Sequence, residues 1–150
     1  MRAPWLTQGY YLDEEKGAEL WDGGWMHTGD VASMEPGGVL QLRDRIKDVI
    51  KTGGEWISSL LLESLINKHP AVAEVAVVGV PDARWDERPL ALVVPVAGAG
   101  LEPASVQRHL AQFVESGAIS KWAVPEQIRI VDEIPKTSVA GRAGTLLRRI

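Results

Sequence analysis

The stretch LRDRIKDVIKTGGEW holds the residues whose types and spacing could most readily do chemistry. Six charged side chains lie between residues 43 and 51, and Gly53 and Gly54 follow them. The cations could meet the phosphate groups of a ligand, while the glycines let a backbone lie against it because they carry no side chain. The same residues could also form a solvated face of paired charges that contribute little to stability. Spacing alone leaves both interpretations open.

A second candidate is the turn sequence WMHTGD, which ends in Asp30. A carboxylate held at a tight turn could accept hydrogen bonds from vicinal hydroxyls such as those of a ribose. An aspartate in a turn more commonly serves the turn itself, so the motif predicts little when taken alone.

Composition narrows the classes of function. A formal net charge of -4 gives no general attraction to nucleic acid, which argues against nucleic-acid binding through residues 43–51. The sequence has no cysteine, which excludes disulfides, thiolate metal sites and thiol nucleophiles, and we expect a cytoplasmic protein. No apolar run approaches the roughly 18 residues that cross a bilayer, so no membrane span is predicted.

The hydrophobic pattern predicts the elements that position these candidates. From residue 43 onward the order is strand, helix, strand, strand, helix, strand, which indicates one small α+β domain. Ser58 and Ser59 can cap the first helix, and Pro103 opens the second. The three later strands are expected over residues 72–80, 89–96 and 126–134, with the polar loop PDARWDER between the first two.

Residues 1–42 have a different character. Gly, Asp and Pro separate short aromatic or aliphatic pairs, which predicts irregular, β-rich structure. Four large aromatic residues lie in the first half of this segment: Trp5, Tyr10, Tyr11 and Trp21. We interpret the segment as the edge of a β subdomain that belongs to something larger.

Four ordered motifs carry a family resemblance: GYYLDEEKGAELWDGGWMHTGDVA, LRDRIKDVIKTGGEWISS, VAEVAVVGVPDARWDERPLALVV and VDEIPKTSV. Over residues 1 to about 139 the chain resembles the C-terminal end of an AMP-forming acyl-CoA synthetase of the adenylate-forming superfamily, nearest to the medium-chain fatty-acyl-CoA ligase branch. The resemblance implies a small mobile C-terminal lid domain at residues 43–150, with a short mixed or antiparallel sheet flanked by helices. It also implies that residues 1–42 are a β-rich remnant of the large N-terminal domain.

The resemblance implies an activity as well. Such enzymes activate a carboxylic acid with ATP and Mg²⁺, hold an acyl-adenylate, and transfer the acyl group to coenzyme A. Their large N-terminal domain carries the phosphate loop and the acyl pocket, so that missing domain is the expected partner through which the acid, ATP and CoA are met. We expect no metal ligands in this chain and no adenylation by the chain alone.

Individual residues match the motifs of the family. The resemblance assigns Asp30 and Arg45 to the ribose of AMP, and Asp44 to the hinge about which the lid rotates. Five residues match the face used in thioester formation, where small residues let the pantetheine arm of CoA pass: Lys51, Gly53, Gly54, Glu55 and Trp56. We interpret Glu87 in RWDERP and Trp122 in SKWAVPEQ as structural.

The tail departs from the family pattern. After PKT the family runs through two residues to a glycine and then to a lysine that enters the active site during adenylation. The sequence PKTSVAGRAG puts Ala140 and Gly141 at those places without a gap, or Gly141 and Arg142 with one inserted residue. We favour the ungapped register, which places residues 146–148 on the family's final helix. Neither register supplies the lysine, and we hypothesise that the native tail was lost to a change of reading frame or to a sequencing error.

Two functions remain in view. The leading prediction is the C-terminal part of a fatty-acyl-CoA ligase with an intact thioester face and an impaired adenylation face. The alternative is a non-catalytic, stand-alone binding or docking module that keeps the lid fold.

Overall fold

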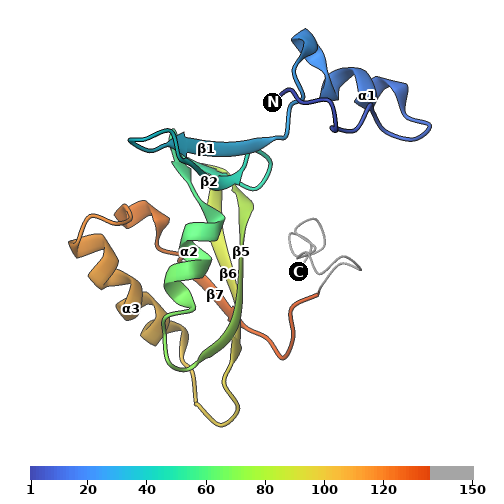
Figure 1. The fold of residues 1–150 in the computed structure, drawn as a ribbon. Helices are drawn as coiled ribbons and strands as arrows, with labels where there is room; N and C mark the ends of the chain where they lie inside the picture. The colour runs from blue at the N-terminus through green and yellow to red at the C-terminus, as the bar shows by residue number, and fades with distance from the viewer. Residues whose placement is uncertain (136–150) are drawn as a thin grey trace. The chain divides into compact units, whose positions relative to one another are not determined.

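A computed structural model describes residues 1–135, which divide into two compact units at Lys47/Asp48 (Figure 1). The first unit covers residues 1–47 and the second begins at Asp48. No helix within residues 1–135 is long and apolar enough to cross a membrane.

The first unit combines one helix with a two-stranded ribbon. Helix α1 spans Glu14–Leu20, and a short 3₁₀ turn, η1, follows at Asp22–Gly24. Strands β1 (Asp30–Met34) and β2 (Leu40–Arg45) pair antiparallel. The ribbon agrees with the β-rich expectation, whereas α1 was not predicted. Its N-cap is Asp13, whose carboxylate accepts a hydrogen bond from the Lys16 amide at 3.1 Å.

The second unit holds a five-stranded mixed sheet. Its elements in chain order are β3 (Ile50–Thr52), β4 (Glu55–Ile57), α2 (Ser59–Ile66), β5 (Val72–Asp82), β6 (Asp86–Pro95), α3 (Pro103–Glu115), the 3₁₀ turn η2 (Lys121–Ala123) and β7 (Gln127–Ile130). The strand order is β4-β3-β6-β5, and β7 pairs parallel with β6. This unit confirms the predicted α+β class with a mixed sheet and flanking helices.

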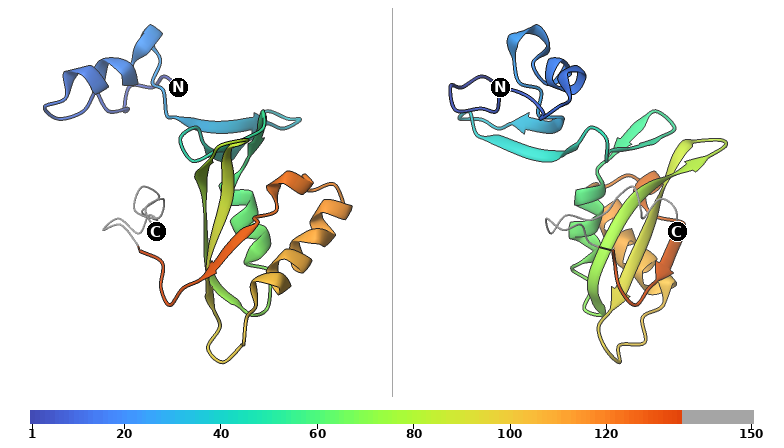
Figure 2. Two further views of the ribbon diagram at one scale, coloured as in Figure 1. Left: turned by 180° about the vertical axis from the view of Figure 1, so that it is seen from behind. Right: turned by 90° about the vertical axis from the view of Figure 1, so that its right-hand side faces the viewer.

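Alternating side chains of the sheet build a hydrophobic core on each of its faces. Val75 and Val77 of β5 belong to the cluster that α2 and α3 cover, and Figures 1 and 2 show both helices on that face. Ala76 and Val78 belong to a second cluster on the opposite face, which includes Ile134 beyond β7. Strand β5 is therefore buried on both faces, as its nearly continuous run of apolar residues implies.

The predicted helix starts are confirmed. Ser58 is the N-cap of α2 and accepts a hydrogen bond from the Leu61 amide at 3.2 Å, and Pro103 is the first residue of α3. The predicted loop PDARWDER is wrong in extent, because β5 continues to Asp82 and β6 begins at Asp86. Asp82 Oδ1 accepts the amides of Arg84 and Trp85, both at 2.9 Å, which closes a tight hairpin in place of a long loop.

Candidate functional site

Asp30 and Arg45, the residues assigned to the ribose, lie directly opposite each other in the β1–β2 ribbon. Arg45 Nε is 3.7 Å from Asp30 Oδ1, and the side chains are 63% and 30% exposed. The pairing follows from the antiparallel register, which places the first residue of β1 beside the last residue of β2. The ribbon therefore presents a carboxylate and a guanidinium together, both partly open to solvent.

The predicted hinge residue, Asp44, is buried within β2, with 4% of its surface exposed. Its Oδ1 accepts a hydrogen bond from the amide of Arg45 at 2.8 Å. The residue lies close before the division between the two units at Lys47/Asp48. Its role as a hinge stays a prediction.

The five residues assigned to the thioester face form one β-hairpin. Strands β3 and β4 pair in the register Ile50↔Ile57, Lys51↔Trp56 and Thr52↔Glu55. Gly53 and Gly54 make the two-residue turn with φ of +55° and +86°. A turn of this kind needs positive φ at both central residues to match the twist of the strands, which is why the sequence places two glycines here.

Side chains along the hairpin alternate between a side that is buried in the domain and a side that faces outward. Ile50, Ile57 and Thr52 are buried, at 0%, 4% and 3% exposure. Lys51 and Trp56 are exposed, and Trp56 retains 61% of its surface. The outward side therefore carries one cation and one large aromatic ring at opposite positions of the register.

The two turn glycines meet different surroundings. A Cβ added to Gly53 would lie 2.9 Å from Cε3 of Trp85, closer than such atoms approach in proteins. A Cβ added to Gly54 would find no atom of residues 1–135 within 4 Å. Gly53 is therefore required by the packing of Trp85 as well as by the turn, whereas the space beside Gly54 is open to a ligand.

A hollow of about 520 Å³ adjoins the β4 side of the hairpin. Glu55 and Trp56 line it together with the start of α2 and residues 117–120. Ser120 donates a hydrogen bond to Glu55 Oε2 at 2.9 Å. Glu55 therefore ties the hairpin to the segment before η2.

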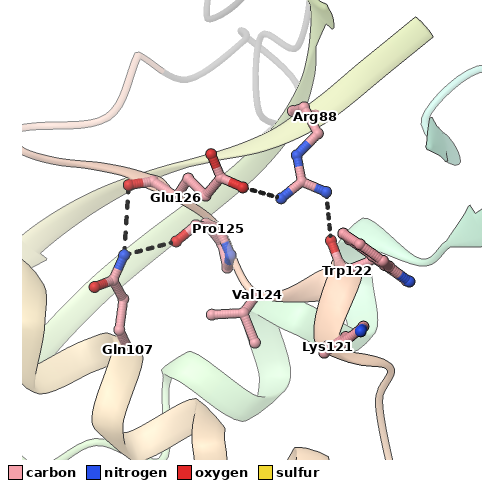
Figure 3. Close-up of a pocket in the computed structure, with 7 residues that line it drawn as sticks. All are labelled: Arg88, Gln107, Lys121, Trp122, Val124, Pro125 and Glu126. Carbon is pink, nitrogen blue, oxygen red and sulfur yellow. Dashed lines mark hydrogen bonds and ion pairs between the residues drawn. The ribbon is translucent and has the colours of Figure 1, made fainter. Parts of the chain in front are cut away.

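A second hollow, of about 300 Å³, lies between β6, α3 and the segment that leads into β7 (Figure 3). The Arg88 guanidinium donates to the carbonyl oxygen of Trp122 at 3.0 Å and to Glu126 Oε1 at 2.7 Å. Gln107 Nε2 donates to the carbonyl oxygen of Pro125 at 3.1 Å. These groups hold the segment around residues 122–126 in place. Sequence reasoning missed Arg88, for which the only signal was a charged residue at the start of an apolar strand.

Trp85 and Trp122 lie side by side, with ring centroids 5.3 Å apart and planes inclined by 39°. A cation lies over each ring, Arg84 over Trp85 at 4.7 Å and Lys121 over Trp122 at 4.6 Å. The packing role predicted for Trp122 agrees with this contact, although 41% of the residue is exposed. The Trp85 ring of this pair also packs against Gly53.

The predictions for the tail have no described geometry. Gly141 and Arg142, the alternative positions for the adenylation lysine, lie outside the described residues, as do residues 146–148, which were expected on a final helix. Within residues 1–135 there is no group of three or more His, Asp or Glu side chains that could hold a metal ion.

The fold is that of the C-terminal domains of adenylate-forming enzymes. The structure of the amide bond synthetase McbA from Marinactinospora thermotolerans matches with a TM-score of 0.86 and 32% identity, covering 99% of this chain and 29% of that one. The model of the AMP-binding enzyme C-terminal domain family matches residues 61–140. The chain belongs to this family, which confirms the resemblance seen in the sequence.

Curated relatives agree. The chain is 42% identical over 149 residues to a 3-methylmercaptopropionyl-CoA ligase of Ruegeria lacuscaerulensis, covering 99% of this chain and 26% of the relative. It is also 42% identical over 150 residues to a long-chain-fatty-acid–CoA ligase of Thermus thermophilus, again covering 99% and 26%. The chain thus spans about a quarter of the length of these relatives.

Proposed function

We propose that the chain acts as the C-terminal lid of an AMP-forming acyl-CoA ligase and supplies the protein surface for the thioester-forming step. The observation that carries the proposal is the β3–β4 hairpin, where the described residues leave the space around Gly54 open and where Lys51 and Trp56 are exposed. A slim thiol-bearing arm needs a wall without side chains, and a cation beside it suits a phosphate-bearing ligand. The coenzyme A ligase names of the relatives support the same step.

In this step the sulfur of coenzyme A attacks the carbonyl carbon of the acyl-adenylate. The C–S bond forms and the bond from carbon to the phosphate oxygen breaks, so AMP leaves with the electron pair and the thiol proton passes to solvent or to the leaving phosphate. We assign Asp30 and Arg45 to the ribose of the adenylate, Asp44 to the hinge, and the hairpin to the passage of the thiol. ATP and Mg²⁺ would bind mainly to the rest of the ligase.

The large N-terminal domain is the proposed partner. Aromatic side chains of the first unit stay open to solvent in this chain, including Trp5 at 82%, Tyr11 at 92% and Trp25 at 56% exposure. Such apolar surface is suited to packing against further protein. We propose that the partner domain selects the carboxylic acid, which we take to be a fatty acid.

A fusion enzyme tests the proposal. This chain replaces the matching quarter of the Thermus thermophilus ligase, and the fusion receives a chemically prepared fatty-acyl-adenylate and CoA. We expect acyl-CoA and AMP to form at a rate that the truncated ligase without a lid does not reach. Equal rates with and without this chain would refute the proposal and leave the docking module as the better account.

The chain alone provides a second test. Without a phosphate loop and an acyl pocket, we expect it to show no carboxylate-dependent exchange between ATP and pyrophosphate. Appreciable exchange by the purified 150-residue chain would contradict the lid assignment.

A further inference from the structure

The hairpin assigned to the thioester step joins the sheet through β3. Strand β3 meets β6 through a single register pair, Thr52↔Asp86, whereas β5 and β6 pair along nearly their whole length. The hairpin is also held by its buried residues Ile50 and Ile57 and by a hydrogen bond from the Gly53 amide to the carbonyl oxygen of Trp85 at 2.9 Å. Further hydrogen bonds join β3 to the start of β6.

Glu87 supplies two of these bonds. Its Oε2 accepts a hydrogen bond from the amide of Lys51 at 3.1 Å, and its carbonyl oxygen accepts one from Thr52 Oγ1 at 2.6 Å. A carboxylate is a stronger acceptor than the neutral carbonyl that a regular ladder would provide. The Lys51 amide, on the outward side of the hairpin, therefore has a charge-assisted partner in the Glu87 carboxylate.

Gly79 makes room for this carboxylate. A Cβ added to Gly79 would lie 2.8 Å from Glu87 Oε2 and 3.1 Å from its Cδ. Gly79 does not have a positive φ, so backbone conformation does not explain the glycine. The two strands together are shaped to hold the Glu87 side chain where it meets the Lys51 amide.

The geometry points to Glu87 as a positioning residue for thioester formation, which fixes the amide of Lys51 and so aims the hairpin that the thiol must pass. This inference rests on the function proposed for the hairpin. It extends beyond a purely structural role, because the bonded atom belongs to a residue of the thioester face itself.

Three variants separate the carboxylate from general packing. Glu87→Ala removes the acceptor, Glu87→Gln keeps an oxygen of the same reach, and Gly79→Ala displaces the carboxylate without altering it. In the whole 150-residue chain we measure hydrogen exchange of the Lys51 and Gly53 amides. We expect roughly tenfold faster exchange at Lys51 in Glu87→Ala and Gly79→Ala, a factor in the range that one hydrogen bond contributes, and recovery of most of the protection in Glu87→Gln.

The fusion enzyme gives the functional readout from supplied acyl-adenylate and CoA. We expect Glu87→Ala to lower kcat for thioester formation about tenfold with little change in the KM for acyl-adenylate, and Glu87→Gln to recover most of the rate.

Unchanged exchange at the Lys51 amide in Glu87→Ala would overturn the inference, whatever the rate of the fusion enzyme. Faster exchange with an unchanged rate would also overturn it, and reduce Glu87 to a structural role. An inactive wild-type fusion would instead refute the proposed function, and the exchange data would still decide whether Glu87 fixes Lys51.

Discussion

Substituting the two turn glycines separately tests whether they serve different purposes. Gly54→Ala places a side chain at φ +86° with no atom of the described residues within 4 Å, so we expect only the penalty of the left-handed conformation, about 1–2 kcal/mol. Gly53→Ala carries the same penalty at φ +55° and also drives a Cβ to 2.9 Å from the Trp85 ring. Forcing extra atoms into a packed contact costs a further 1–3 kcal/mol or so, for a total of roughly 2–5 kcal/mol.

Denaturant unfolding of the 150-residue chain measures both values. A double-mutant cycle isolates the contact: in a Trp85→Ala background we expect the cost of Gly53→Ala to fall to that of Gly54→Ala. In the fusion enzyme we expect Gly54→Ala to slow thioester formation more than Gly53→Ala does. A side chain at position 54 would enter the open space assigned to the thiol. Equal destabilisation by the two substitutions, or no relief from Trp85→Ala, would show that the glycines are not distinguished by packing.

Three further predictions concern other parts of the chain. Burial, and then the neighbouring His109, lower the pKa of His69 below its ordinary value of 6.5, so the folded chain binds this proton less readily than the unfolded chain does. The stability that this ring contributes is therefore fully present above pH 6.5 and declines as the pH falls below that value. The variant His69→Asn can still accept a hydrogen bond from the Ala71 amide, and it should remove this part of the pH dependence of unfolding. Glu126→Ala should destabilise the chain by about 1–3 kcal/mol, because the Arg88 side chain, 9% exposed, loses the carboxylate to which it is bonded. As a control, Glu115→Ala at an exposed position should change the free energy of unfolding by less than about 0.5 kcal/mol. In the fusion enzyme, Gly141→Lys should raise ATP–pyrophosphate exchange and Arg142→Lys should not; the reverse result would favour the register with one inserted residue.

Elements with a local signal were predictable from the sequence. The Ser58 cap, Pro103 at the first turn and the β-branched strands each depend on residues close together in the chain. The structure confirms both helix starts and has a strand in each expected region, although β7 covers only Gln127–Ile130 of the expected 126–134. Helix α1 carried a weaker signal because none of its residues is buried, so it shows no apolar stripe. Its one clue was Asp13 ahead of two glutamates, a pattern that suits a helix N-terminus.

The hairpin joining β5 and β6 was misjudged for a related reason. The residues near its tip are mostly polar and include Pro81, so their composition resembles that of a loop. Exposed residues such as Pro81 and Asp86 are nevertheless compatible with strand ends, because the pairing of β5 with β6 continues to Asp82 and Asp86. Amino-acid composition predicts burial better than it predicts backbone pairing. The length of a strand is therefore easily underestimated where the strand leaves the core.

Contacts between distant segments could not be derived from spacing. The packing of Trp85 on Gly53, the room that Gly79 leaves for Glu87 and the bond from Arg88 to Glu126 each join residues from different elements. A motif match transfers a residue to a role but does not say whether the residue is kept for chemistry or for packing. Of the two glycines that the family motif treats alike, Gly53 is already accounted for by the fold. Both glycines serve the turn through their positive φ, but within residues 1–135 only Gly53 is also explained by a close contact. We therefore place the proposed ligand role on Gly54.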